Sequence, residues 1–253
     1  MRISIITATF NSSRTIQNTF DSLLNQTYKD VELIVKDGGS NDNTLEICRR
    51  YQQAFYGRMH ILCGPDNGIY DAMNQGVRAA TGDIVGILNS DDFYTDENVL
   101  ETVVNAFEKT DCDAVYGDVH YVQEGDLTRC IRYYSSANFT RDRMLYGWML
   151  AHPSFYCRRD VYRKYGLFDE SFKVAADFEH LLRLIYINKI KIQYINKDFV
   201  TMRMGGASTS GIKSHIIVMK EQLKAFKKNN INNNVFRLSL RYFKKILEYC
   251  DGK

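Results

Sequence analysis

Two adjacent carboxylates, Asp91 and Asp92, follow directly after the apolar run 84–88. A continuous apolar run is typical of a parallel strand covered on both faces, so these acids would stand at its carboxyl end. Ligands of open α/β sheets bind at that end, and paired carboxylates there can bind a hard cation such as Mg²⁺ or Mn²⁺. The cation would offset the charge of a phosphate-bearing ligand. Alternatively, Ser90-Asp91-Asp92 caps the helix that we expect from about Asn98.

Short polar side chains also follow the two earlier strands. The first strand ends in Thr7, Thr9 and Asn11, and the second ends in Asp37-Gly-Gly-Ser. If these strands neighbour the 84–88 strand, their loops converge on one crevice that can hold a nucleoside, with Asp37 accepting from a base or ribose. A tight turn with Asp42 or Asn43 capping the next helix explains the second segment equally well, and turn and site are compatible.

Several other kinds of chemistry lack their usual motifs. No Gly-x-Gly-x-x-Gly follows the first strand and no Gly-x-x-x-x-Gly-Lys-Ser/Thr loop occurs, so hydride transfer and P-loop phosphoryl transfer lose their main support. The six cysteines include no Cys-x-x-Cys pair, and the five histidines form no His-Glu-x-x-His pattern. The sequence therefore indicates neither a zinc site nor a disulfide framework.

Strand and helix patterns alternate through the first half of the chain. We expect strands at 2–7, 31–36, 59–63, 83–88 and 114–117, and helices at 14–25, 44–56, 69–80 and 98–110. This βαβ series predicts an α/β fold with a mostly parallel central sheet flanked by helices. The second half differs, with strands around 119–134, an apolar segment at 153–157, a helix at 177–188 and two short strands within 192–202. We interpret it as an acceptor-side extension of the same sheet.

The basic charge is concentrated at the end of the chain. The 253 residues carry a net charge of +3, yet ten lysines and arginines stand against three acids from Lys213 onward. We expect one domain over 1–212 and a basic amphipathic helical tail over 213–253. Such a tail can lie on an anionic membrane, or pack on the domain or on a second subunit of a homodimer. We favour packing.

The composition is that of a folded protein. Hydrophobic residues make up 45% of the chain, and no run reaches the roughly 18 apolar residues of a membrane span. The N-terminus enters an Ile-rich strand without a basic region. We expect a cytoplasmic protein, with any membrane contact at the inner face, and no nucleic-acid partner.

Several segments, taken in order, resemble the motifs of family 2 glycosyltransferases with the GT-A fold, over roughly residues 1–210. They are Thr9-Phe-Asn11, Gln26-Thr-Tyr28, Asp37-Gly-Gly-Ser40, Asp66-Asn-Gly-Ile-Tyr-Asp-Ala-Met-Asn-Gln-Gly76, Asn89-Ser-Asp-Asp92, Gly166-Leu-Phe-Asp-Glu170 and Ala176-Asp-Phe-Glu179. Several motifs in order are far more specific than one. The resemblance implies a Rossmann-like nucleotide-binding half, an acceptor half, and inverting transfer from a UDP or GDP sugar with Mg²⁺ or Mn²⁺.

The resemblance also implies roles for single residues. Asp37 would contact the base or ribose, Asp91 the ribose or sugar, and Asp92 the metal that bridges the pyrophosphate, while Asp71 and Asn74 would line the donor pocket. The chain departs from the family in two places, with Gly38 where a second Asp is frequent and Gln75 where a Lys is frequent.

Inverting transfer needs a carboxylate that takes the acceptor's proton as its oxygen attacks the anomeric carbon. Asp177 matches the family's catalytic acid and opens the expected 178–188 helix. Without the resemblance, the simpler interpretation is that Asp177 is an N-cap and Glu179 a first-turn acid. We predict Asp177 as the base, with Glu179 as the second choice.

Three further residues are candidates beside the reacting groups. Arg203, before Gly205-Gly206, could close over the diphosphate, although an arginine there can also be solvated surface. His152 lies in a segment that resembles the family's acceptor site, and Trp148 could stack on an acceptor sugar; a structural histidine and core packing are the alternatives.

We therefore predict a metal-dependent, inverting glycosyltransferase that adds one sugar from a nucleotide diphosphate donor to a glycan or lipid-linked acceptor, in surface polysaccharide or lipopolysaccharide synthesis. Single addition is favoured because the Gln-x-x-Arg-Trp motif of processive members is missing. The rivals are a nucleotidyltransferase, whose Gly-rich basic first loop is not found, and a non-catalytic sugar-nucleotide-binding protein that uses Asp177 only as a cap.

Overall fold

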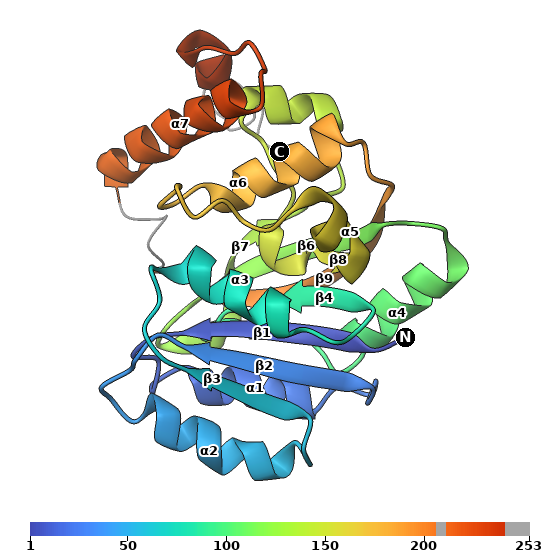
Figure 1. Ribbon diagram of the computed structural model, residues 1–253, viewed down its shortest axis with the longest axis vertical. Helices are drawn as coiled ribbons and strands as arrows, with labels where there is room; N and C mark the ends of the chain where they lie inside the picture. The colour runs from blue at the N-terminus through green and yellow to red at the C-terminus, as the bar shows by residue number, and fades with distance from the viewer. Residues whose placement is uncertain (206–210, 241–253) are drawn as a thin grey trace.

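The structure is a computed structural model and describes residues 1–205 and 211–240 (Figure 1). Its first half is a parallel sheet in the order β3-β2-β1-β4. The strands are β1 (Ile3–Thr9), β2 (Val31–Asp37), β3 (Met59–Cys63) and β4 (Ile84–Ile87), and the helices between and after them are α1 (Ile16–Leu24), α2 (Thr44–Ala54), α3 (Ile69–Ala79) and α4 (Val99–Lys109). The α/β prediction is confirmed, and the strands that end in Thr9, Asp37 and Asn89 are neighbours.

Helices cover both faces of this sheet, as the continuous apolar strands require. Ile5 of β1 packs with α1, α2 and α4 on one face, whereas Ile6 packs with α3 and α6 on the other. The close approach of α3 depends on Gly76, because a Cβ there would lie 2.4 Å from Cγ2 of Ile6. The first turn of α3, which carries Tyr70, is thereby fixed beside the strand ends.

The second half extends the sheet with mixed strand directions. It contains β5 (Phe93–Tyr94), β6 (Ala114–Gln123), β7 (Asp126–Tyr134), β8 (Tyr156–Arg158) and β9 (Ile192–Arg203). Beyond β4 the order is β8-β6-β9-β5, and β7 pairs with β6. The helical elements are η1 (Arg141–Tyr146), η2 (His152–Ser154), α5 (Arg159–Tyr165), α6 (Ala176–Leu181) and the π-helical turn η3 (Leu182–Ile187) that continues α6.

Two strand predictions in this half are wrong. The two short strands expected within 192–202 form the single strand β9, and the strand expected to stop at Gly117 continues to Gln123. Register shifts on either side of Asp118 accommodate the irregular segment without ending the ladder. The buried Asp118 carboxylate accepts hydrogen bonds from Tyr133 and Tyr194, so the polar residue that resembles a strand end is satisfied inside the sheet.

The beginning of the predicted tail forms α7 (Gly211–Lys228), which lies across α6 at the top of Figure 1. Phe226 is buried, and its ring meets that of Phe178 at 5.5 Å. Glu221 accepts the backbone N–H groups of Lys173, Val174 and Ala175 at 2.9 Å each. The helix α7 therefore packs on the domain, which is the alternative that we favoured.

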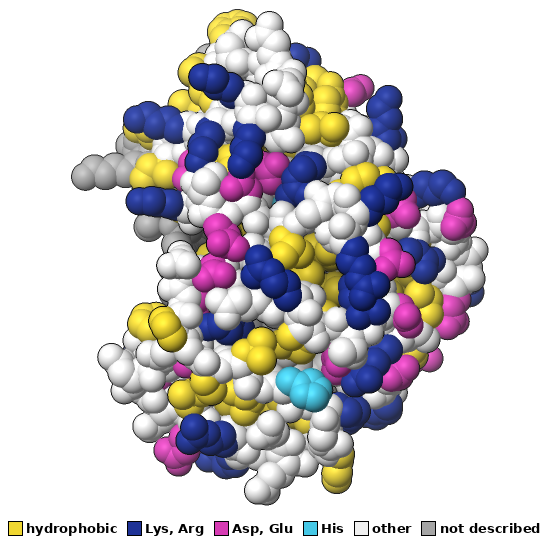
Figure 2. Space-filling model, in the orientation of Figure 1, with side chains coloured by type: hydrophobic (Ala, Val, Ile, Leu, Met, Phe, Trp, Pro, Cys, Tyr) yellow, Lys and Arg dark blue, Asp and Glu magenta, His cyan; other side chains and the backbone are white. Residues whose placement is uncertain are grey.

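The basic side chains of this region do not form a uniform patch. Figure 2 shows Lys and Arg over α7 and α6 in the upper part of the face, with carboxylates among them. Lys228 pairs with Asp169, and Lys224 lies over the ring of Phe172 at 4.3 Å. No helix of the described residues is long and apolar enough to cross a bilayer. The end of the predicted tail, 241–253, lies outside the described residues.

Candidate active site

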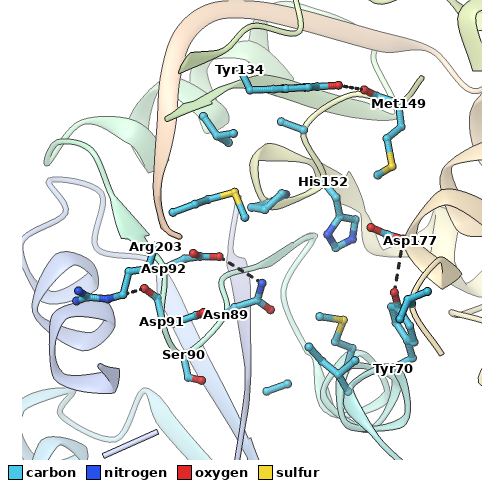
Figure 3. A pocket seen from close by; sticks show the side chains of 18 of the residues that line it. Tyr70, Asn89, Ser90, Asp91, Asp92, Tyr134, Met149, His152, Asp177 and Arg203 are labelled. Atoms are coloured by element: carbon cyan, nitrogen blue, oxygen red, sulfur yellow. Dashed lines mark hydrogen bonds between the residues drawn. The ribbon is translucent and has the colours of Figure 1, made fainter. Parts of the chain in front are cut away.

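A cavity of about 450 Å³ lies where the carboxyl end of β4 faces α3 and α6 (Figure 3). Its walls come from both halves of the chain. They include Tyr70 and Met73 of α3, the Asn89–Asp92 segment after β4, Tyr121 and Tyr134 of β6 and β7, Met149–Pro153, Lys173, Val174, Asp177, Met202 and Arg203. Residues as far apart in the sequence as Ala8 and Arg203 therefore share one space.

Asp91 and Asp92 form one wall of the cavity. They do not cap α4, because β5 intervenes and the N-cap of that helix is Asn98, so this alternative is wrong. Burial and the neighbouring Asp91 hold the pKa of Asp92 well above its ordinary value, and burial also raises the pKa of Asp91. The Nε of Arg203 donates to the Asp91 carbonyl at 3.0 Å, not to a carboxylate. Among the described residues neither carboxylate forms an ion pair within 4.0 Å, and the positive charge of Arg203 only partly opposes the rise of the two pKa values.

The wall fits a divalent cation bound jointly with a ligand. The Asn89 amide donates to Asp92 Oδ2 at 3.3 Å, while the buried Asn89 Oδ1 has no hydrogen-bond partner. The oxygens in this segment are the hard ligands that Mg²⁺ and Mn²⁺ take. In the described part of the chain no group of three or more His, Cys, Asp or Glu side chains could hold a metal alone. The remaining ligands would have to be diphosphate and water oxygens, which is how Mg²⁺ is usually held at phosphate sites.

Asp177 lies on the opposite wall, in the first turn of α6 (Figure 3). Ala175, not Asp177, is the N-cap, so the capping alternative is wrong. Burial raises the pKa of Asp177 above its ordinary value, whereas the nearby His152 opposes that rise. The hydroxyl of Tyr70 donates to Asp177 Oδ1 at 3.5 Å. A buried carboxylate of raised pKa, facing a cavity, has the properties of a general base.

His152 stands between these two walls. It lies in η2, and burial lowers the pKa of its imidazole, so the ring is neutral near pH 7. Its ring contacts that of Phe168 edge-on at 5.7 Å. A neutral imidazole beside Asp177 can hydrogen-bond a sugar hydroxyl without introducing a second charge.

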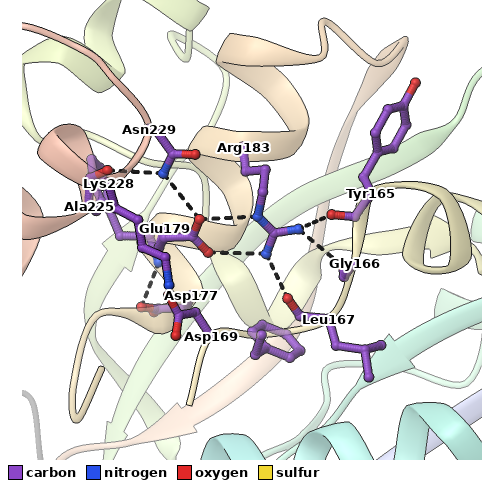
Figure 4. Close-up of polar contacts among 12 residues, drawn as sticks. Tyr165, Gly166, Leu167, Asp169, Asp177, Glu179, Arg183, Ala225, Lys228 and Asn229 are labelled. Atoms are coloured by element: carbon purple, nitrogen blue, oxygen red, sulfur yellow. Dashed lines mark hydrogen bonds and ion pairs between the residues drawn. The ribbon is translucent and has the colours of Figure 1, made fainter. Parts of the chain in front are cut away.

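Glu179, two residues after Asp177, does not line the cavity. Figure 4 shows its carboxylate directed toward Arg183 and Asn229. Its carboxylate pairs with Arg183 at 3.1 Å and accepts from Asn229 at 3.1 Å. Arg183 in turn donates to the carbonyls of Tyr165, Gly166 and Leu167. Glu179 thus connects α6, the loop after α5 and the end of α7, and the geometry favours Asp177 as the base.

The predicted donor residues of the first two strand ends support the loops rather than line the cavity. Asp37 is buried and accepts from the backbone of Gly39 and Ser40 and from the Ser40 hydroxyl, which is the tight-turn alternative. Thr7 donates to the Leu88 carbonyl at 2.8 Å, tying β1 to the start of the acidic segment. Thr9 Oγ1 is buried without a partner, and Asn11 Oδ1 accepts from the Asn41 amide at 2.9 Å.

Asp71 and Asn74 also have partners within the protein. Asp71 accepts from the Asn67 backbone at 2.9 Å and from Gln75 at 3.2 Å, which orders the turn before α3. The Asn74 amide exchanges two hydrogen bonds of 2.9 Å with the backbone of Phe168, and so joins α3 to the acceptor half. Trp148 lines a second, smaller pocket beside the main cavity.

The structure therefore brings Asp91, Asp92, Arg203, His152 and Asp177 together at one cavity. Sequence reasoning missed Tyr70, Met73, Tyr134 and Met149 as lining residues. Tyr70 and Met73 lie inside a segment that the resemblance had singled out, so a signal was present for them. Tyr134 and Met149 carry no comparable signal, because β7 and the loop after η1 are placed by tertiary contacts.

Comparison with known proteins agrees with this fold. The family model described as Glycosyl transferase family 2 matches residues 4–166. The chain therefore belongs to glycosyl transferase family 2, and it is a glycosyltransferase that uses a nucleotide sugar. The recognition made from the ordered motifs is confirmed.

Curated relatives extend the match beyond residue 166. The chain is 31% identical over 223 residues to a PGL/p-HBAD biosynthesis glycosyltransferase of Mycobacterium tuberculosis, covering 87% of this chain and 82% of that protein. It is 28% identical to a chondroitin synthase of Pasteurella multocida, covering 92% of this chain but 24% of that protein.

Solved structures share the fold at low sequence identity. S. aureus TarS 1-349 in complex with UDP-GlcNAc superposes with a TM-score of 0.68 at 19% identity, covering 89% of this chain and 66% of that one. The mannosyltransferase PcManGT from Pyrobaculum calidifontis, in complex with GDP-Man and Mn²⁺, gives 0.68 at 18%, covering 92% and 65%. The GT-A fold prediction is confirmed. The chain spans 39% of full-length TarS.

Proposed function

We propose that this protein is an inverting, metal-dependent glycosyltransferase that moves one sugar from a UDP or GDP sugar to a saccharide or lipid-linked acceptor. One observation carries the proposal: a carboxylate pair and a separate buried carboxylate of raised pKa form opposite walls of one cavity. An inverting displacement needs this arrangement, because the leaving group departs on one side of the sugar and the acceptor is deprotonated on the other.

On the donor side, the buried Asp92 would hold Mg²⁺ or Mn²⁺, and Asp91 beside it would contact the ribose or sugar of the donor. The bound cation would offset the negative charge that develops on the departing diphosphate. Arg203 lies at the same wall, where its guanidinium is already fixed by the Asp91 carbonyl and by Asn18 at 2.8 Å. From this position it can approach the diphosphate with its remaining N–H groups.

On the acceptor side, Asp177 takes the proton of the attacking hydroxyl. The new bond joins that oxygen to the anomeric carbon, the bond from this carbon to the diphosphate oxygen breaks, and its electron pair leaves with the nucleoside diphosphate. Tyr70 donates to one carboxylate oxygen, which leaves the other free to receive the proton. His152 lies between the two walls and can orient the acceptor hydroxyl.

The fit of the donor side is supported by what related structures bind. TarS 1-349 was solved with UDP-GlcNAc, and PcManGT with GDP-Man and Mn²⁺. The named activities of the relatives, PGL/p-HBAD biosynthesis in M. tuberculosis and a chondroitin synthase in P. multocida, support a saccharide or lipid-linked acceptor for surface polysaccharide or lipopolysaccharide synthesis.

The test is a thermal-shift screen of UDP, GDP, CDP and dTDP sugars with and without Mn²⁺, followed by a transfer assay. A ligand at a hundred times its Kd stabilises the native state by about 2.7 kcal/mol, and each kcal/mol raises the Tm of a domain this size by roughly 2–4 °C. We expect such a shift for UDP or GDP sugars only with Mn²⁺. Equal shifts with and without metal would contradict the metal dependence. If the protein binds the donor but neither transfers the sugar nor hydrolyses the donor, it is a non-catalytic sugar-nucleotide-binding protein.

A further inference from the structure

A second pocket of about 180 Å³ lies beside the main cavity, on the outer side of β7. Its lining includes Arg132, Ser135, Asn138, Arg143 and Trp148, and it shares Tyr134 and Met149 with the main cavity. The Tyr134 hydroxyl donates to the Met149 carbonyl at 2.6 Å, so these two residues form a fixed wall between the two spaces (Figure 3). A ligand whose reacting group lies near Asp177 can extend over this wall.

The charged side chains that line the second pocket are both positive. Two arginines line it, and none of its ten lining residues is acidic. Among the described residues no carboxylate lies within 4.0 Å of the guanidinium of Arg132 or Arg143. The nearby buried Asp118 does not line the pocket, and its carboxylate accepts hydrogen bonds from Tyr133, Tyr194 and the backbone of Ser136. The two arginines are therefore the charged side chains that line the pocket.

Both guanidinium groups are held in place by aromatic rings. Arg143 lies over Trp148 at 5.3 Å and donates to the Asn138 carbonyl at 2.8 Å, while Arg132 lies over Tyr121 at 5.3 Å. Tyr121 itself lines the main cavity. Arginines fixed in this way lose little side-chain entropy when they bind a planar or tetrahedral oxyanion.

We propose that this pocket is an acceptor subsite that binds an anionic group, a carboxylate or a phosphate, carried by the acceptor beside the unit that receives the sugar. The assignment of the bound molecule as the acceptor rests on the proposed function, whereas the binding of an anion does not. With about 180 Å³, against about 450 Å³ for the main cavity, the second pocket suits one small charged group.

The chain provides its own reporter for this pocket, because Trp148 is its single tryptophan. We would titrate the full chain with methyl glucuronide, glycerol phosphate and the neutral methyl glucoside, and follow Trp148 fluorescence. We expect saturable changes in the millimolar range with one or both anions and none with the glucoside, weakened by added salt. Tighter binding of methyl glucuronide would identify an acidic sugar as the source of the anion, and tighter binding of glycerol phosphate would identify a phosphate group.

Two variants test the arginines, and a third is the control. Arg132→Gln and Arg143→Gln should each weaken the anion response by about tenfold, as expected for one lost charge-assisted hydrogen bond. Arg163→Gln should bind like wild type, because Arg163 is exposed on α5 and pairs with Asp160. The first variant matters most, because it leaves Arg143 on the tryptophan ring and the fluorescence baseline unaltered.

The proposal is overturned if no anion changes the Trp148 signal, if the neutral glucoside gives the same response, or if both arginine variants bind the anions as wild type does. Donor binding is measured separately by the Mn²⁺-dependent thermal shift, which neither arginine variant should alter. A protein that binds anions at Trp148 but no sugar nucleotide would refute the proposed function alone. A protein that binds donor but no anion would refute the subsite alone.

Discussion

Asp177 and Glu179 lie two residues apart on α6, and the structure predicts opposite consequences when each is made neutral. In Asp177→Asn the cavity loses its proton acceptor. A positioned general base contributes a factor of about 10²–10⁴, so kcat should fall by this factor, equivalent to about 3–5.5 kcal/mol of barrier. Because burial raises the pKa of Asp177, its ionised form destabilises the native state, and the amide variant should be at least as stable as wild type.

Glu179→Gln is the matched control. Glu179 is 2% exposed and forms an ion pair with Arg183, so removing its charge leaves a partly buried guanidinium without its counterion. Breaking such a pair costs about 3–5 kcal/mol, of which the retained amide contacts should recover part. We expect a Tm lower by roughly 5–10 °C, at 2–4 °C per kcal/mol. The folded variant should keep its specific activity within a few-fold.

Both variants would be assayed by calorimetry, by Mn²⁺-dependent donor binding and by transfer rate below the melting transition. The reasoning fails if Asp177→Asn retains the wild-type rate while it binds donor normally, since the base would then lie elsewhere. It fails equally if Glu179→Gln abolishes transfer without loss of stability, since Glu179 would then have a chemical role that the geometry does not provide.

Three further predictions concern other residues of the site and its support. Asp92→Asn should lose the Mn²⁺-dependent thermal shift of roughly 5–10 °C with UDP or GDP sugars, which Asp126→Asn at the start of β7 should keep. Tyr70→Phe removes a donor to the Asp177 carboxylate and so should move the acid limb of the kcat–pH profile upward, by a fraction of a pH unit at this 3.5 Å contact; an unchanged limb would rule out the contact. His180 is buried with both ring nitrogens unpartnered, and burial holds its pKa well below the ordinary value. The unfolded chain then binds one more proton than the native state, so the free energy of unfolding should fall as the pH drops below about 6.5. Urea titrations of His180→Phe should show a weaker pH dependence and a free energy of unfolding higher by about 1–3 kcal/mol.

The sequence determined the fold of the first half and one wall of the site. Apolar runs that end in Thr9, Asp37 and Asn89 indicate buried parallel strands, and the rule that such strand ends face one edge predicts the Asp91–Asp92 pair at a ligand site. These inferences are local, because the periodicity of strands, the turn residues and the order of the elements can be recognised from short segments of the sequence. Ordered motifs added the family, and with it Asp177.

Tertiary structure decided which of the candidate acids face the cavity. Asp37 and Glu179 look as reactive in the sequence as Asp92 and Asp177, yet the first closes its own turn and the second is paired with Arg183. Asn229 donates to Glu179, and Glu221 accepts from the backbone just before α6. Neither role can be recognised from the local sequence. Their partners are about 50 residues away in the sequence, and local sequence patterns do not predict contacts between residues so far apart. The second pocket is more local, because all of its lining residues fall within 132–149, but only the folded chain places it beside the main cavity, through Tyr134 and Met149.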